Sequence, residues 1–192
     1  MGFTQYKQTF LSTLDLLDIK EINKFIELLV DAYNSRKMVF VIGNGGSASN
    51  ASHLAQDLAK GTRINNNQKN RLRALSLTDN MAFITAQGND DGYNTIFEQQ
   101  LRTFANTGDM VIAISGSGNS PNVIEAIDWA NKNGLVTLGV TGFDGGKLKK
   151  TAMHSVHVPV NDMRTAESVH TVIFHYVVRQ LIEKFKVLND LP

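Results

Sequence analysis

Residues 39–47, which read VFVIGNGGS, pass directly from an apolar run into a group of glycines. Three of the four apolar residues at the start are β-branched, which is typical of a buried β-strand. The glycines predict a tight turn, and a turn between a strand and a helix can hold a phosphate group at the helix N-terminus. The stretch therefore predicts one strand–turn–helix unit, and it raises the question of which phosphorylated molecule the turn binds.

Short apolar runs alternate with longer helical patterns along the chain. The predicted strands cover residues 38–42, 73–77, 110–114, 136–140 and 155–160. The predicted helices cover residues 49–60, 79–86, 121–133, 146–151 and about 162–185. Strands that alternate with helices form a parallel sheet covered on both faces. We therefore expect an α/β fold, a three-layer sandwich with a five-stranded parallel sheet.

Apolar residues also recur every three or four positions between Phe3 and Tyr33. This spacing predicts two amphipathic helices that meet near Asp18. The sequence contains no linker, low-complexity tract or run of charges that would divide it. We therefore expect one domain over residues 1–192, with residues 1–36 as an N-terminal helical extension.

The composition disfavours several classes of protein. Nineteen lysines and arginines against eighteen aspartates and glutamates give a formal net charge of +1, which provides no electrostatic reason to bind nucleic acid or a membrane. The lack of cysteine excludes disulfides and thiolate metal sites. The sequence shows no leader pattern and no apolar run of about 18 residues. We expect a soluble, cytoplasmic protein.

A nucleotide site is the first alternative for the glycine turn. Residues 43–48 match the loose Gly-x-Gly-x-x-Ala form of a dinucleotide fingerprint. That fingerprint is usually confirmed by an acidic residue about 20 positions further on, whereas the nearest acid after the second predicted strand is Asp79. No Gly-Lys-Ser/Thr sequence occurs either, which disfavours a P-loop. The turn therefore favours another phosphorylated ligand.

A second loop of the same kind follows the third predicted strand and reads SGSGNSP over residues 115–121. Pro121 is suited to the first position of a helix, and free amides at a helix N-terminus bind anions. Three serines among glycines add hydroxyl donors, so the loop predicts a site for a compact dianion such as a phosphate ester. The alternative is that Ser120 only caps the helix and the glycines only make a turn.

Both loops, IGNGGSASNASH and ISGSGNSPNVIEAI, resemble those of the SIS (sugar isomerase) domain family, whose members bind phosphosugars. The segments HLAQDL, GNDDGYNTIF and TGFDGGKL, and a last helix with two histidines, are most similar to the phosphoheptose isomerase group. The resemblance covers nearly the whole chain. It implies a flavodoxin-like sheet and a homotetramer with sites at subunit interfaces. Some relatives with this fold bind partner proteins instead.

The resemblance also implies which residues bind the substrate. The phosphate would be held by the second loop, in which a glycine stands where the family commonly has a threonine. The sugar would lie against the first loop, an acid of the GNDDGYN segment and a position on the last helix. The implied substrate-binding residues are Asn44, Gly45, Gly46, Ser47, Asp90, Ser115, Gly116, Ser117, Ser120 and Glu167. A plain turn residue is the alternative for Asp90.

The implied catalytic residues are Asp57 as base and His175 as acid, and the implied zinc ligands are His53, Asp57, Glu167 and His175. His53 and Asp57 are four residues apart, which places them on one face of a helix. Glu167 and His175 are eight residues apart, so on a helix their side chains differ in direction by about 80° and lie about 12 Å apart along the axis. Either both side chains reach toward a point between them, or one of them serves the site of a neighbouring subunit. His170 lies about 140° round the helix from His175 and is not expected in the site.

Besides the glycine in the second loop, the chain departs from the family at three positions. Asp57 stands where the family has a glutamate, and Glu167 stands where it has a glutamine. The family's arginine after the catalytic acid is Gly61 here, with Lys60 and Arg63 as nearby substitutes. A base misplaced by about 1 Å can lower a rate by about 100-fold. Either the backbone compensates, Glu167 serves as base, or the substrate differs.

The leading hypothesis is an isomerase that converts sedoheptulose 7-phosphate to D-glycero-D-manno-heptose 7-phosphate, used for surface polysaccharide, through an enediol. One alternative is a non-catalytic SIS protein that senses a phosphosugar or associates with a replication initiator, against which the presence of His175 argues. Another is an isomerase of a different sugar phosphate.

Overall fold

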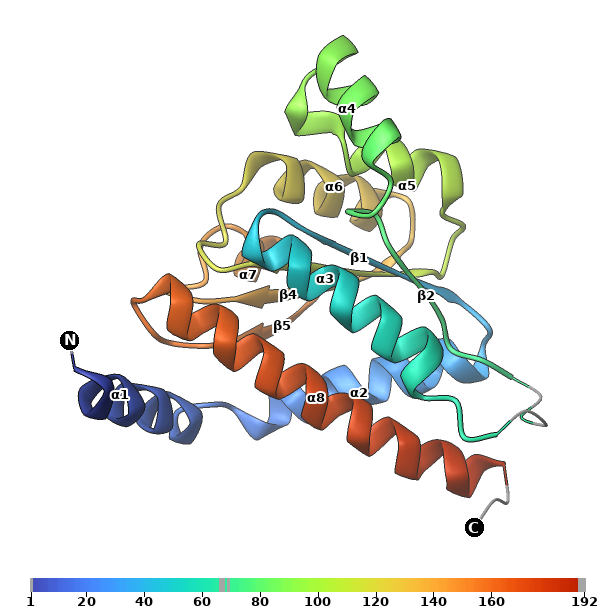
Figure 1. Cartoon of the computed structure of the whole chain (residues 1–192). Helices are drawn as coiled ribbons and strands as arrows, with labels where there is room; N and C mark the ends of the chain where they lie inside the picture. Colours follow the sequence, from blue (N-terminus) through green and yellow to red (C-terminus); the bar gives the residue numbers. More distant parts are fainter. Residues whose placement is uncertain (1, 66–67, 69, 190–192) are drawn as a thin grey trace.

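The computed structural model describes residues 2–65, 68 and 70–189 (Figure 1). It contains a sheet of five parallel strands in the order β2-β1-β3-β4-β5. The strands are β1 (Met38–Gly43), β2 (Arg73–Ser76), β3 (Met110–Ser115), β4 (Val136–Thr141) and β5 (His154–His157). This order is that of a flavodoxin-like sheet. The predicted α/β fold with a five-stranded parallel sheet is confirmed.

Helices precede, connect and follow the strands. They are α1 (Phe3–Asp15), α2 (Ile19–Asn34), α3 (Gly46–Gln56), the π-helical turn η1 (Asp57–Gly61), α4 (Met81–Asp90), the 3-10 turn η2 (Tyr93–Thr95), α5 (Glu98–Phe104), α6 (Pro121–Lys132), α7 (Leu148–Thr151) and α8 (Met163–Leu188). Aspartate side chains begin two of them: Asp18 accepts a hydrogen bond from the Lys20 amide, and Asp162 accepts one from the Thr165 amide.

Strand β5 and helix α5 differ most from the sequence prediction. Strand β5 ends at His157 rather than at Val160, because Pro159 has no amide hydrogen for the ladder. Helix α5 was not predicted. It has only seven residues, of which Gln100 and Leu101 are buried, so it is too short to show a helical period of apolar residues.

Helices cover both faces of the sheet (Figure 1). Alternate residues of β1 point to opposite faces, so Val39 and Val41 pack with α2, α3 and α8, while Phe40 and Ile42 pack with α5, α6 and α7. Every residue of β3 is buried, which explains why that strand is a continuous apolar run. No helix in the described part of the chain is long and apolar enough to cross a membrane. The single-domain organisation expected for residues 1–192 stays a prediction.

The strand order creates a crevice at the carboxyl ends of β1 and β3. These strands are neighbours, but the helices that follow them lie on opposite faces of the sheet, α3 on one and α6 on the other. Such a change of direction opens a crevice between the two loops, and it is where ligands bind in open α/β sheets.

His170 is a fully buried polar residue of the core on α8. Its Nε2 donates a hydrogen bond to the Thr141 carbonyl, and its Nδ1 has no partner in the described structure. Burial lowers the pKa of this imidazole from 6.5 to about 4, because the charged form would lose its hydration. His170 is therefore neutral in the folded protein near pH 7.

We predict that His170 makes the protein less stable in mild acid. The unfolded chain takes up a proton on this residue below pH 6.5, whereas the folded chain takes it up only near pH 4. Stability is thus fully present above pH 6.5 and falls as the pH drops toward 4, by about 3 kcal/mol. Urea unfolding of wild type and His170→Gln at pH 7.5 and 5 measures this. An equal loss in both proteins would contradict it.

Candidate functional site

The two glycine- and serine-rich loops line one pocket of about 280 Å³ at the crevice between β1 and β3. Two further residues of the lining, Met163 and Glu167, come from the start of α8. Of the predicted substrate-binding residues, the pocket brings together Asn44, Gly45, Gly46, Ser47, Ser115, Gly116, Ser117, Ser120 and Glu167. Asp90 is outside this lining. It lies exposed at the end of α4, where its carboxylate accepts a hydrogen bond from the Asn89 side chain.

The second loop keeps its hydroxyl groups near the pocket. Gly118 adopts a φ of +67°, and its amide donates to both the carbonyl and the hydroxyl of Ser115. Ser120 occupies the N-cap position of α6, but its side chain makes no capping hydrogen bond and lies 3.4 Å from the Ser115 hydroxyl. The structure therefore does not support the alternative that the Ser120 side chain only caps the helix.

The loop after β4 supports the second loop from outside. The Leu148 amide donates to the Gly118 carbonyl at 2.9 Å, and the Gly142 amide donates to the Gly116 carbonyl at 2.9 Å. A Cβ atom on Gly118 would overlap the Gly145 carbonyl oxygen. The TGFDGG segment thus fixes the backbone of the serine loop, which is why both sequences need glycines.

The electrostatics of the pocket suit one compact anion. Its described lining contains no lysine, arginine or histidine. The N-termini of α3 and α6 supply the positive potential, because their first amides are free and their helix dipoles point toward the crevice. The one charged lining group is Glu167, whose carboxylate lies so close to Gly46 that it would overlap a Cβ atom on that residue. Because Gly46 has no side chain, the Glu167 carboxylate has room at this position.

A second group of candidate functional side chains lies further along α3 and α8. Helices α3 and α8 contact each other through Asn50, whose side chain donates to the Glu167 carbonyl at 3.1 Å and accepts from the Thr171 hydroxyl at 3.0 Å. Helices α3 and α8 lie side by side (Figure 1). Beyond the Asn50 contact, α3 continues into η1, and His175 of α8 lies 3.9 Å from Asp57 at the start of η1. π-Helical turns are frequent at functional sites.

His53, Asp57 and His175 form a cluster there. The Asp57 Oδ2 atom lies 3.4 Å from His53 Nε2 and 3.9 Å from His175 Nε2, and the two imidazole rings are 5.1 Å apart. The potential ligand atoms of all three lie within 4.8 Å of one another. The side chains of the two histidines are about half exposed, 49% and 55%, so the cluster opens to solvent in the single chain.

This cluster fits a divalent metal ion by its donors. Two imidazole nitrogens and a carboxylate oxygen are the usual ligands of a catalytic zinc, with a fourth position left for water or substrate. Glu167 is not part of the cluster. It points into the pocket two turns earlier on α8, because eight helical residues span about 12 Å.

The sequence matches the SIS domain family over residues 3–142. The chain belongs to the SIS domain family. It is 36% identical to the phosphoheptose isomerase of Clostridium acetobutylicum over 86% of this chain and 83% of that protein. It is 33% identical to that of Aliarcobacter butzleri over 94% and 93% of the two chains.

Solved structures of the family agree. A phosphoheptose isomerase from Neisseria gonorrhoeae has a TM-score of 0.84 at 27% identity and covers 93% of this chain and 94% of its own. One from Francisella tularensis has a TM-score of 0.85 at 26% identity and covers 95% and 94%. The SIS resemblance found in the sequence is confirmed.

Sequence reasoning missed three residues in or next to this SIS pocket. Met163 belongs to the lining. Asn122 and Tyr93 lie behind the lining, where they hydrogen-bond to Asn44. Asn122 follows Pro121 in the SIS loop motif and was a plausible polar position at a helix start, but nothing in the sequence pairs it with Asn44. Lys60 and Arg63, the expected substitutes for the family's arginine, are exposed and do not line the pocket.

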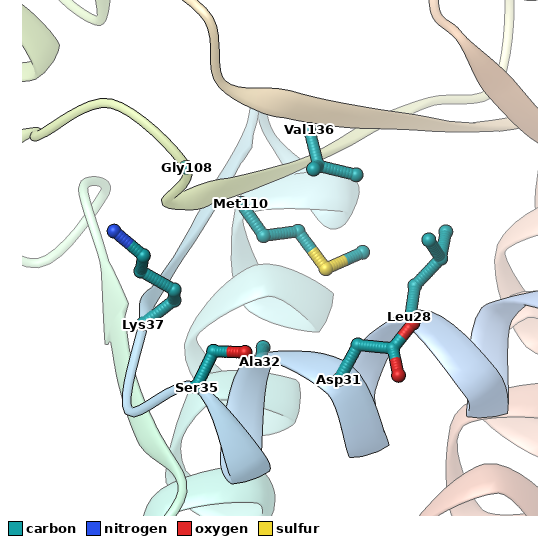
Figure 2. Close-up of a pocket in the computed structure, with 8 residues that line it drawn as sticks. All are labelled: Leu28, Asp31, Ala32, Ser35, Lys37, Gly108, Met110 and Val136. Atoms are coloured by element: carbon teal, nitrogen blue, oxygen red, sulfur yellow. The ribbon is translucent and has the colours of Figure 1, made fainter.

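A second hollow, of about 200 Å³, lies at the opposite, amino-terminal edge of the sheet (Figure 2). Its lining combines apolar side chains such as Met110 and Val136 with Asp31 and Lys37. The Lys37 ammonium group donates to the Thr107 carbonyl at 2.8 Å, so its charge is already engaged. Ligands of open α/β sheets bind at the carboxyl ends of strands, and we assign no SIS function to this hollow.

We predict that Gly118→Ala destabilises the SIS fold more than Gly134→Ala. Both glycines have positive φ, +67° and +74°, and that conformation alone costs an alanine about 1 kcal/mol. Gly118→Ala must also displace the Gly145 carbonyl, whereas a Cβ atom on Gly134 meets only the end of the Thr107 side chain, at 3.0 Å. We expect a loss above about 2 kcal/mol for Gly118→Ala, measured by urea unfolding. Equal losses would contradict the close contact between the two loops.

Proposed function

We propose that this protein is a phosphoheptose isomerase that converts sedoheptulose 7-phosphate to D-glycero-D-manno-heptose 7-phosphate. The observation that carries the proposal is that an anion pocket and a His–Asp–His cluster lie along the same two helices, α3 and α8. The relatives named phosphoheptose isomerase, 33% to 38% identical to this chain, support the choice of substrate.

The pocket would hold the phosphate and the cluster would act on the other end of the sugar. His53 lies seven positions after Gly46 on α3, a rise of about 10 Å. An extended seven-carbon sugar phosphate is of comparable length. With the phosphate on the amides and hydroxyls of the two loops, C1 and C2 can therefore reach the cluster.

Isomerisation moves a proton between these two carbons. Asp57 removes the proton from C1 while His175 donates a proton to the C2 carbonyl oxygen, which gives the enediol. The proton then returns to C2, and the C1 hydroxyl loses its proton as the aldehyde forms. Asp57 is shorter than the glutamate of the family, but its carboxylate lies within 4 Å of both histidines, which supports Asp57 rather than Glu167 as the base.

We assign a further role in this site to zinc. His53, Asp57 and His175 would hold the ion, which supplies a positive charge that stabilises a developing oxyanion. Glu167 would remain in the pocket and accept hydrogen bonds from sugar hydroxyls, since its carboxylate faces the loop residues.

The half-exposed cluster supports an oligomeric enzyme. Enediol chemistry benefits from the exclusion of water, and the single chain leaves both histidines open. Beside His175, an apolar groove of about 300 Å³ runs between α1, α2 and α8; it is lined by Leu14, Leu17, Ile19, Ile22, Val172, Ile173 and Tyr176. Further copies of the chain on this face would bury the groove and close the site, as in a homotetramer. The cytoplasmic location expected from the sequence stays a prediction.

Purified protein should convert sedoheptulose 7-phosphate to the aldose, and Asp57→Asn and His175→Ala should each lower kcat by at least about 100-fold, the usual contribution of an acid or base. Coupled assay or NMR of the sugar measures this, with His154→Gln on β5 as the control. Thermal shift with the same ligand runs in parallel. Binding without turnover in wild-type protein would reject the isomerase and support a phosphosugar-binding protein.

Protein purified without chelator should contain close to one zinc per chain by elemental analysis. His53→Ala and His175→Ala should remove most of it, since each deletes a ligand. Glu167→Gln should retain it, because Glu167 lies outside the cluster. Loss of zinc in Glu167→Gln would contradict the three-residue site and favour a ligand set completed between subunits.

A further inference from the structure

Asn44, at the end of β1, is held by two neighbours that belong to distant parts of the chain. Its Oδ1 atom accepts hydrogen bonds from the Tyr93 hydroxyl at 3.0 Å and from the Asn122 side chain at 3.0 Å. Its Nδ2 atom donates to Asn122 Oδ1 at 2.8 Å. The oxygen of this amide is thus fully used, while one of its two N–H groups has no partner within the described chain.

The reciprocal pair with Asn122 ties the orientations of the two amides to each other. Turning the Asn44 amide alone by half a turn would set oxygen against oxygen and N–H against N–H, and polar groups left unpaired in this way are costly. Asn122 is the second residue of α6 and is 2% exposed, so its side chain has little freedom to turn with Asn44. The Tyr93 hydroxyl, which donates to the Asn44 oxygen, selects the observed orientation of the pair.

Tyr93 adds a link to the segment between β2 and β3. Helix α4 of this segment buries none of its residues and stands out from the body of the protein at the top of Figure 1. Tyr93 follows α4 in η2, and its side chain is well exposed, 57%. Its hydroxyl group nevertheless reaches Asn44 inside the pocket lining.

We propose that Asn122 and Tyr93 are positioning residues that hold Asn44 with its free N–H toward the pocket. Asn44 then donates a hydrogen bond to an oxygen of the bound sugar phosphate and offers it no acceptor. The inference rests on the proposed function to the extent that the pocket binds a phosphosugar. It does not depend on turnover, because it concerns binding.

A double-mutant cycle tests this assignment. Tyr93→Phe removes one hydroxyl group and leaves an exposed ring, so we expect KM for sedoheptulose 7-phosphate to rise about 5-fold with little change in kcat. Asn122→Ala leaves Asn44 without its partner, and KM should rise by roughly 10-fold or more. In an Asn44→Ala background neither change should raise KM further, because both act through Asn44.

The controls separate positioning from general damage. Asn131 lies on the same helix, away from the pocket, and its amide also bonds on both sides, to the Thr151 carbonyl and the Thr137 hydroxyl. Asn131→Asp and Tyr6→Phe should leave KM unchanged. Additive effects in the Asn44→Ala background, or no effect of Tyr93→Phe where Asn44→Ala weakens binding, would overturn the assignment.

Failure of the proposed function is distinguishable from failure of this inference. If the enzyme does not turn over the sugar, the same cycle is read from the ligand-induced thermal shift with sedoheptulose 7-phosphate, which depends on binding alone. Loss of the shift in Tyr93→Phe and Asn122→Ala, but not in the two controls, supports the positioning role without turnover. No shift in wild-type protein would overturn both the pocket assignment and this inference.

Discussion

Strands β1 and β3 lie next to each other in the middle of the sheet, yet the helices that follow them cover opposite faces. Because α3 and α6 both begin at this point, the positive ends of two helices face the same small volume. Their free amides make an anion site whose described lining has no cationic side chain. The loops only have to supply hydroxyl groups and to stay small enough for the backbones to approach each other.

The contact between α3 and α8 extends this site along the molecule. Asn50 bonds to Glu167 and Thr171, and it thereby holds the two helices side by side between the pocket and the His–Asp–His cluster. Glu167 lies at the pocket end of α8 and His175 at the cluster end. The carboxylate of Glu167 therefore adds its charge to the pocket rather than to the cluster within one chain.

Most of the fold could be predicted from sequence because its signals are local. Apolar runs, glycine turns and Pro121 mark the strands, the loops and a helix start. The pairing of His53 with Asp57 follows from helical spacing alone. Helix α5 has only seven residues, too few to show a helical period of apolar residues. The apolar pattern extends beyond the end of β5 at His157, because Pro159 lacks the amide hydrogen that a further ladder bond needs.

The remaining parts of the site depend on contacts between distant residues. Asn44 and Asn122 are 78 positions apart in the sequence, and Tyr93 and Asn44 are 49 positions apart. No local sequence pattern therefore predicts their hydrogen bonds. The four implied zinc ligands illustrate the same limit. Helical geometry already indicated that Glu167 and His175 stand far apart, but only the packing of α8 on α3 shows which of them meets His53.

The helix that joins the anion pocket to the cluster also limits how the protein can change. One inserted residue in α3 before His53 would move that imidazole about 1.5 Å along the axis and turn it by about 100°, away from His175. Only whole turns would keep the two imidazoles facing, and these come in steps of about 5 Å. Adaptation to shorter or longer sugars is therefore easier through the flanking loops than through the length of this helix.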